Sequence, residues 1–231
     1  GPETIAQAFR DAPELLRGCF VVGELATLRR AAACIEGPGH PSLPVARLAH
    51  AQEAWDMPPR CLPVLALPGL PGPQPWGQVS AEAGRAAAHC VQWAARAALG
   101  GELAALVTAP LHKEALAAAG VDFPGHTELL QAEAARHAGV PLADMPVRMM
   151  LANDELRTVL VSIHVSLRDA LAAVTFGNVL QTLRITHAAL ARSLGRAPRI
   201  AVAGLNPHAG EGGLFGREEI EVIAPAMAQA R

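Results

Sequence analysis

The sequence predicts an α/β fold in which helices pack against a sheet that is at least partly parallel. Strand-like segments alternate with helical segments along most of the chain, as is typical of layered α/β proteins. The chain has 231 residues, of which 51% are hydrophobic and 17% charged. This composition excludes intrinsic disorder and provides a core for one large domain or two small ones.

Six short runs rich in Val, Leu and Ile are the predicted strands. They span residues 19–23, 61–67, 103–109, 147–151, 156–164 and 199–205. Helical periodicity is clearest over the Ala-rich residues 80–99 and over residues 178–194. A further helix is expected from Arg217 onward.

Two proline-rich segments interrupt this pattern. Seven of the 19 prolines fall within residues 58–75, and residues 67–77 cannot form the interior of a helix or a central strand. Residues 37–44 form a second break of the same type. Both are expected to be rigid loops or junctions between subdomains.

Charge and cysteine content exclude several classes of protein. The 19 Lys and Arg residues nearly balance the 21 Asp and Glu residues, and no basic run suggests nucleic-acid binding. No apolar stretch is long enough to span a bilayer, and no signal peptide is visible. The four cysteines form no CxxC pair and are expected to be reduced thiols. We therefore expect a soluble cytoplasmic protein.

Functional groups in an open α/β sheet usually lie beyond the carboxyl ends of the strands. We therefore expect them in the loops after Ala109, His164 and Leu205. None of these loops carries a GxSxG or Walker A motif, and residues 210–215 have Phe where GxGxxG requires its last Gly. A serine hydrolase, a P-loop enzyme and a Rossmann dinucleotide site are thus disfavoured.

Lys113 is the only lysine among the 19 basic residues. It follows a predicted strand and lies near the first turn of the next helix, where the helix dipole disfavours a cation unless an anion is near. Lys113 could bind a phosphate or carboxylate, exchange a proton, or be an ordinary surface lysine.

His126 and Thr127 lie where a turn enters another helix. Thr127 is predicted to be the N-cap, and the free N–H groups behind it would suit an anion. Plain capping by Thr127, with His126 as a solvated turn residue, is the alternative.

His164 and His208 each follow a predicted strand. A lone histidine at this position can be a metal ligand, an acid/base group or, most often, a core residue, but two such imidazoles in one sheet can converge on a metal ion. Glu218, Glu219 and Glu221 occur at the start of the helix after His208. They would repel a phosphate and would suit a cation site or simple compensation of the helix dipole.

Four segments together resemble the 4-hydroxythreonine-4-phosphate dehydrogenase family. They are TAPLHK at 108–113, PGHTELL at 124–130, SIHVSLRD at 162–169 and GLNPHAGEGG at 204–213. Residues 1–3 also resemble the end of a Gly/Pro-rich segment of that family, whose members continue beyond the equivalent of Arg231 with a third metal-binding histidine. We therefore expect the chain to be truncated at both ends.

The resemblance implies a two-subdomain fold similar to isocitrate and isopropylmalate dehydrogenases, with a mixed, largely parallel sheet. Residues 1–231 would form one catalytic unit of two interleaved subdomains, acting as a homodimer. The implied cofactors are NAD or NADP and a divalent cation, zinc, magnesium or cobalt. No residue is assigned to the dinucleotide.

The resemblance also implies residue roles and a reaction. His164 and His208 would bind the metal, His126 and Thr127 the phosphorylated substrate, and Lys113 would lie beside the reacting centre. The reaction would be oxidation of 4-phosphooxy-L-threonine to a β-keto acid that decarboxylates to 3-amino-2-oxopropyl phosphate, in pyridoxal phosphate biosynthesis.

Alternative functions remain at this stage. One is a dehydrogenase of a related 4-phosphorylated sugar acid, threonate or erythronate. Another is a metal-dependent lyase or hydrolase that uses the same two histidines without a nucleotide. A scaffold without catalytic activity would bind neither metal nor nucleotide.

Overall fold

The structure is a computed structural model that describes residues 1–39 and 42–231. It divides into two compact units, residues 1–145 and 146–231. Part of the predicted break at 37–44 lies outside the described residues. The prediction of two interleaved subdomains in one catalytic unit stays a prediction.

The first unit contains a three-stranded parallel sheet in the order β1-β3-β2. Its strands are β1 (Val21–Val22), β2 (Val45–Leu48) and β3 (Leu62–Leu65). Two of them confirm the predicted runs at 19–23 and 61–67, and the parallel pairing was also predicted. The strand β2 was not predicted from the sequence.

The central strand β3 tolerates a proline because of its register. The Leu62 N–H donates to the Pro44 carbonyl at 2.8 Å, on the β2 side. Because N–H groups alternate along a strand, the nitrogen of Pro63 faces the β1 side, where pairing begins only at Val64. Pro63 therefore removes no hydrogen bond from the ladder.

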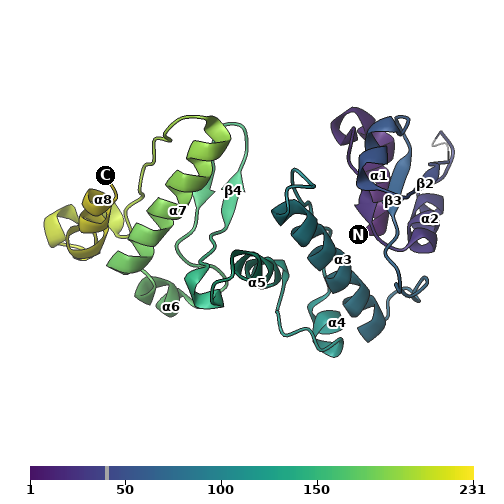
Figure 1. Ribbon diagram of the computed structural model, residues 1–231. Coiled ribbons are helices and arrows are strands. Elements are labelled where there is room, and N and C mark those ends of the chain that lie inside the picture. The colour runs from purple at the N-terminus through teal and green to yellow at the C-terminus, as the bar shows by residue number, and fades with distance from the viewer. Residues whose placement is uncertain (40–41) are drawn as a thin grey trace. The chain divides into compact units, whose positions relative to one another are not determined.

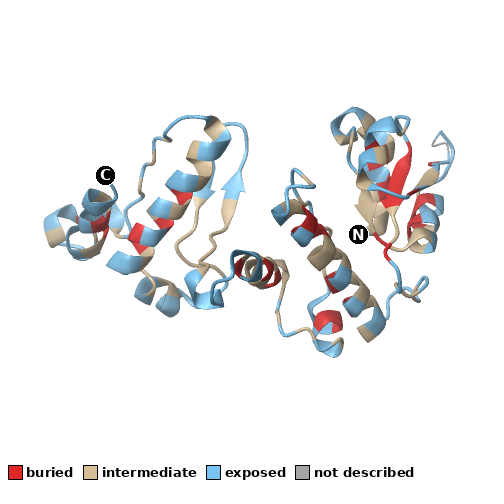
Figure 2. Ribbon diagram, in the orientation of Figure 1, coloured by how far each residue is buried: buried red, intermediate tan, exposed pale blue. Residues whose placement is uncertain are grey.

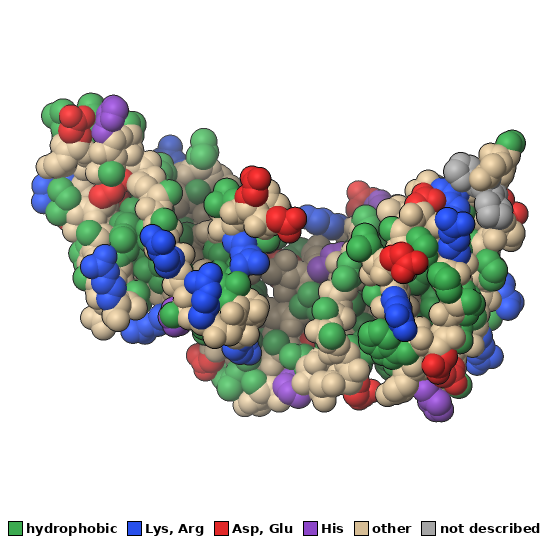
Figure 3. Space-filling view, turned by 90° about the horizontal axis from the view of Figure 1, so that it is seen from above, with side chains coloured by type: hydrophobic (Ala, Val, Ile, Leu, Met, Phe, Trp, Pro, Cys, Tyr) green, Lys and Arg blue, Asp and Glu red, His purple; other side chains and the backbone are tan. Residues whose placement is uncertain are grey.

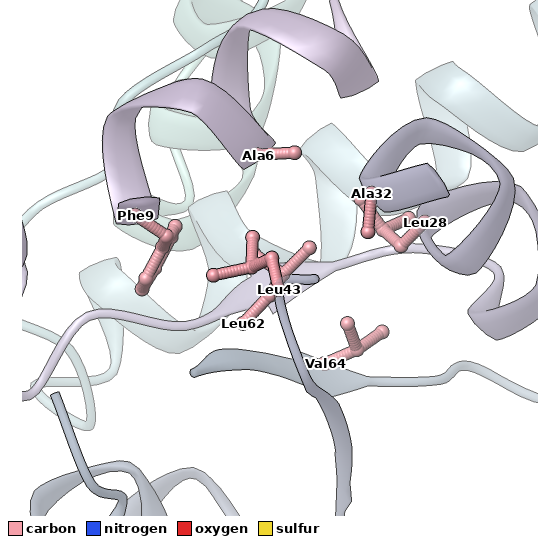
Figure 4. Packing of buried hydrophobic residues seen from close by; sticks show 7 residues of the cluster. All are labelled: Ala6, Phe9, Leu28, Ala32, Leu43, Leu62 and Val64. Atoms are coloured by element: carbon pink, nitrogen blue, oxygen red, sulfur yellow. The ribbon is translucent and has the colours of Figure 1, made fainter. Parts of the chain in front are cut away.

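Helices α1 (Pro2–Asp11) and α2 (Leu25–Cys34) pack against this sheet (Figure 1). Leu62 and Val64 of β3 are completely buried, and Figure 4 shows them in one cluster with side chains of the two helices. Glu24 caps α2 by accepting hydrogen bonds from the N–H groups of Ala26 and Thr27. Figure 2 shows this core as the red residues around β3.

Three helices complete the first unit: α3 (Ala81–Leu99), α4 (Lys113–Ala118) and α5 (His126–Ala138). α3 confirms the predicted helix at 80–99, and Ser80 is its N-cap. Both α4 and α5 pack against α3. The buried carboxylate of Glu133 on α5 accepts two hydrogen bonds from Arg96 on α3, at 3.0 and 3.1 Å, and also pairs with Arg136.

The second unit begins with an antiparallel pair, β4 (Met150–Ala152) and β5 (Arg157–Val159). These strands are shorter than the predicted runs at 147–151 and 156–164. Asn153 orders the turn between them, because its side-chain oxygen accepts hydrogen bonds from two N–H groups of the turn.

Three α-helices follow in this unit. They are α6 (Leu167–Ala172), α7 (Phe176–Leu194) and α8 (Ala224–Ala230), and a π-helical turn, Glu219–Ile223, leads into the last of them. Thr175 caps α7, which confirms the predicted helix at 178–194. α7 and α8 bury Val179, Leu180 and Ala226 against each other (Figure 2).

Short 3-10 turns connect several of these elements. They are Pro13–Leu16, Ala51–Asp56 and Leu142–Asp144, whereas Pro207–Gly213 contains left-handed backbone. Within residues 67–77 the structure is irregular, as the prolines predict.

The predictions of strands at 103–109 and 199–205 were wrong. Neither segment joins a sheet within the described residues, and the Val107 side chain is 93% exposed. A run of apolar residues favours an extended backbone, but a strand also needs a hydrogen-bonded neighbour, which the local sequence does not specify.

Charged side chains of both signs are mixed on one face of the molecule (Figure 3). On the face shown in Figure 3, Lys and Arg are interspersed with Asp and Glu and with apolar side chains. This agrees with the net charge of -2. Within the described residues, no helix has the length and apolar character needed to cross a membrane.

Candidate active site

Lys113 is the first residue of α4, as predicted, and its side chain is exposed. No hydrogen bond or ion pair to it occurs within the described part of the chain. Close packing sets the position of α4. A Cβ built on Gly84 of α3 would lie 2.0 Å from the carbonyl oxygen of Ala115, so the two helices approach as closely as they do only because residue 84 is glycine.

The prediction that Thr127 is an N-cap was wrong. The helix α5 begins at His126, and Gly125 is its N-cap, with φ -173°. Because glycine has no side chain, no side-chain hydrogen bond caps α5, and Thr127 lies inside the first turn. The first N–H groups of this 13-residue helix therefore keep the donor capacity that a bound anion uses.

His126 carries a buried polar atom without a partner. Its Nε2 is shielded from solvent and makes no hydrogen bond within the described residues. Such an atom costs about 1–3 kcal/mol. The same helix terminus thus combines uncapped N–H groups with an unsatisfied imidazole, which agrees with a substrate-binding role for His126 and Thr127 without testing it.

His164 and His208 share an uncommon backbone conformation. Both are in the left-handed region, with φ values of 54° and 52°. In the described chain the other non-glycine residues with positive φ are Arg60, Ala209 and Glu211. Non-glycine residues in this region cost free energy, and such residues cluster at active sites and ligand clamps.

The loop around His208 is a left-handed turn rather than an ordinary 3-10 helix. Six consecutive residues, 208–213, have positive φ, from His208 (φ 52°, ψ 30°) through Gly212 (φ 68°, ψ 15°) to Gly213 (φ 101°). Left-handed helical backbone costs about 1–2 kcal/mol for each non-glycine residue. His208, Ala209 and Glu211 all bear this cost.

Glu219 contacts the backbone that leads into this turn. Its carboxylate accepts hydrogen bonds from the N–H groups of Leu205 (2.8 Å) and Asn206 (2.7 Å) and from Nδ2 of Asn206 (2.9 Å). The hydrogen bonds from Asn206 are the main reason that the pKa of Glu219 is lowered to about 2. Glu218 accepts a second hydrogen bond from Nδ2 of Asn206, at 2.7 Å.

This role of Glu219 was not predicted from the sequence, where a cation site and compensation of the helix dipole were the alternatives for Glu218, Glu219 and Glu221. In the structure, Arg217 pairs with Glu221, and the other two carboxylates face Asn206.

The chemistry of the two candidate metal ligands fits a divalent cation. Both imidazoles are exposed, and neither forms a hydrogen bond with a described residue. The ring of His208 has only a tilted contact with the ring of Phe215, with centroids 6.1 Å apart. Neutral imidazoles free of protein partners are common ligands of zinc and cobalt.

Both histidines belong to the second unit, whereas Lys113, His126 and Thr127 belong to the first. No group of three or more His, Cys, Asp or Glu side chains able to hold a metal ion occurs within residues 1–39 and 42–231. The convergence of His164 and His208 on one cation, with a third ligand elsewhere, stays a prediction.

Comparison with known proteins identifies the family. A sequence model of the family described as pyridoxal phosphate biosynthetic protein PdxA matches residues 16–231. The chain belongs to the PdxA family. Its similarity to 4-hydroxythreonine-4-phosphate dehydrogenase from Beijerinckia indica is 46% identity over 233 aligned residues, which covers all of this chain and 64% of that protein. The chain therefore spans slightly less than two thirds of this PdxA relative.

Two further PdxA relatives are informative. The crystal structure of 4-hydroxythreonine-4-phosphate dehydrogenase from Klebsiella pneumoniae matches with a TM-score of 0.82 and 37% identity, over 99% of this chain and 66% of that one. This match confirms the predicted fold class. D-Threonate 4-phosphate dehydrogenase from Salmonella typhimurium is 39% identical over 234 residues, which covers all of this chain and 67% of that protein.

Proposed function

We propose that this PdxA-family protein is an NAD(P)-dependent 4-hydroxythreonine-4-phosphate dehydrogenase that uses a divalent cation. It would oxidise 4-phosphooxy-L-threonine to a β-keto acid, which then loses carbon dioxide. The observation that carries this proposal is the shared left-handed backbone of His164 and His208, whose exposed imidazoles form no hydrogen bond with any described residue. Membership in a family named for pyridoxal phosphate biosynthesis supports it.

Each of the two units would contribute a different chemistry. In the second unit, His164 and His208 would hold the cation, which supplies Lewis-acid polarisation of the substrate. In the first unit, the uncapped start of α5 with Thr127 and His126 would bind the phosphate, because N–H groups, a hydroxyl and an imidazole can all donate to it.

Lys113 would move the proton of the substrate hydroxyl. Its ammonium is compact and can give up a proton, which a guanidinium cannot do, and no described residue pairs with it. A bound NAD(P) would supply the acceptor for the hydride that leaves the carbon bearing that hydroxyl.

The main test combines metal analysis with turnover. His208→Ala in the full-length protein, dialysed against metal-free buffer, should lose bound cation and NADH formation. His187→Ala is the matched control, because His187 is an exposed histidine of α7 in the same unit. Cation retained by His208→Ala at the wild-type stoichiometry would contradict the assignment of His208 as a ligand.

A dehydrogenase of 4-phosphorylated threonate is the second candidate. The 39% identity to the Salmonella D-threonate 4-phosphate dehydrogenase favours it. The phosphate-binding groups of α5 would serve both substrates, so a panel of 4-phosphooxy-L-threonine, threonate 4-phosphate and erythronate 4-phosphate, scored by NADH formation, separates them. A lyase or hydrolase would form no NADH with any of the three.

We also propose a cytoplasmic homodimer, as the family resemblance implies. Large apolar side chains that are mostly exposed in the single chain support an association with further protein surface. They include Leu15, Val107, Leu167 and Leu214. Sedimentation velocity of the full-length protein tests this, and a monomer at enzymatic concentrations would contradict it.

A further inference from the structure

Glu219 connects two segments that are distant in sequence. It lies 13 residues after Asn206, and its Oε1 accepts the N–H groups of Leu205 and Asn206, while its Oε2 accepts Nδ2 of Asn206. These three donors come from the two residues just before Pro207 and His208. One carboxylate therefore fixes both the backbone and the side chain at the entrance to the left-handed turn.

Three glycines make room for this contact. A Cβ on Gly210, which is buried, would lie 2.9 Å from Oε2 of Glu219, and a Cβ on Gly204 would lie 3.4 Å from its Oε1. A Cβ on Gly216 would lie 2.5 Å from both Nδ2 of Asn206 and Oε2 of Glu218. The backbone of the loop thus lies close to these partly exposed carboxylates, which dipole compensation alone would not require.

We propose that Glu219 is a positioning residue that holds the left-handed turn and thereby orients His208 toward its cation. The inference rests on the proposed role of His208 as a ligand. A left-handed turn with three non-glycine residues is unfavourable by itself, so it persists only when the surrounding structure determines it. Glu219 accepts three hydrogen bonds from Leu205 and Asn206, the two residues that lead into the turn.

The test compares three variants of the full-length protein. Glu219→Ala removes all three acceptor contacts, and Glu219→Gln keeps an oxygen for the two N–H groups but places an amide against Nδ2 of Asn206. Glu221→Gln is the matched control, because it removes the same charge from the same turn, but Glu221 pairs with Arg217 rather than with Leu205 or Asn206.

Two measurements are made on each variant. The first is the affinity for Co²⁺, which is followed by the visible absorption of the bound ion in the absence of substrate. In Glu219→Ala this affinity should fall by about ten- to hundredfold, which is the usual effect of losing a residue that orients a metal ligand. It should fall less in Glu219→Gln and stay unchanged in Glu221→Gln. Hydrogen exchange should show loss of protection at residues 205–214 in Glu219→Ala, with α7 still protected.

The outcomes separate this inference from the proposed function. If a folded Glu219→Ala protein binds Co²⁺ as tightly as the wild type, the positioning role of Glu219 is overturned. An equal loss of Co²⁺ affinity in Glu221→Gln would also overturn it, because it would indicate an effect of charge alone. If His208→Ala binds Co²⁺ as tightly as the wild type, the ligand assignment fails. Hydrogen exchange then decides whether Glu219 holds the turn, and unchanged exchange in Glu219→Ala would overturn that part too.

Discussion

The two units present their candidate residues in opposite ways. In the first unit, Lys113 and His126 begin ordinary right-handed helices, and the local cost is an imidazole nitrogen without a partner. In the second unit, the imidazoles of His164 and His208 are exposed, and the cost lies in the left-handed backbone. Helix starts can offer N–H groups to an anion, whereas a strained turn can aim one side chain at a cation.

The largest effect that we expect within the first unit is on turnover. Lys113→Arg keeps the charge at the start of α4 but replaces a titratable ammonium with a guanidinium that stays protonated. Turnover should fall about a hundredfold, the usual scale for a lost general acid or base. NADH formation at saturating substrate measures this.

Arg192→Lys is the control for Lys113→Arg, because Arg192 is exposed near the end of α7. It makes the reverse exchange at a position without an assigned role and should leave turnover unchanged. If Lys113→Arg also keeps near-normal turnover with the same pH dependence, Lys113 is an ordinary surface lysine. The first unit then has no proposed catalytic residue.

A stability measurement tests how the first unit positions Lys113. Gly84→Ala would place a Cβ against the carbonyl oxygen of Ala115 and should force α4 away from α3. We expect a loss of about 2–3 kcal/mol in the free energy of unfolding, at the upper end for overpacking. Denaturant unfolding measures the loss.

Gly177→Ala is the matched control. Gly177 is also a helical glycine, in α7, but nothing lies within 4 Å of its added Cβ. It should be neutral or stabilise by about 0.5 kcal/mol, because alanine favours helix. Equal effects of the two substitutions would show that close packing at Gly84 does not position α4.

In the second unit the corresponding test is on the left-handed turn. Gly210→Ala places an alanine in left-handed backbone and puts its Cβ 2.8 Å from the Gly216 carbonyl oxygen. We expect the free energy of unfolding to fall by about 2 kcal/mol. Gly212 also has positive φ, 68°, but nothing lies within 4 Å of an added Cβ. Gly212→Ala should therefore lower the free energy of unfolding by only about 1 kcal/mol. If Gly212→Ala is the more damaging by denaturant unfolding, the enclosure around Glu219 is not what stabilises the turn.

The elements that sequence predicted well are those whose signals are local. The helices α3 and α7 have apolar periodicity and a side-chain cap at Ser80 or Thr175, so their starts agree with the structure within about two residues. The runs at 103–109 and 199–205 failed because a strand depends on a partner elsewhere in the chain. The four-residue strand β2 was too short to give a clear alternation.

The candidate site shows the same limit. Histidine residues after strand-like runs were visible in the sequence, but their positive φ was not, because histidine does not by itself specify left-handed backbone. The contact between Glu219 and Asn206 spans 13 residues, and only the paired acidic residues hinted at it. A missing N-cap at α5 was also hidden, since Thr127 is a better cap by residue type than Gly125.

The smallest effect that we expect concerns Glu24, the counterpart of Glu219 in the first unit. Both carboxylates accept backbone N–H groups, but Glu24 caps an ordinary helix with donors only two and three residues away. Burial raises the pKa of Glu24, yet the hydrogen bonds from Ala26 and from the hydroxyl and N–H of Thr27 outweigh it, so the pKa is lowered.

A lowered pKa in the folded state sets the direction of the pH dependence. The ionised Glu24 stabilises the fold fully above the unfolded pKa of about 4.3, and this contribution is lost as the pH falls through the lower folded pKa. Glu24→Gln should therefore be less stable than the wild type at pH about 6, by at most about 1 kcal/mol, and the difference should shrink on acidification. Glu36→Gln is the control, because Glu36 is exposed just beyond α2, and its stability relative to the wild type should not depend on pH in this way. If the stability difference between the wild type and Glu24→Gln grows toward low pH, the capping role is contradicted.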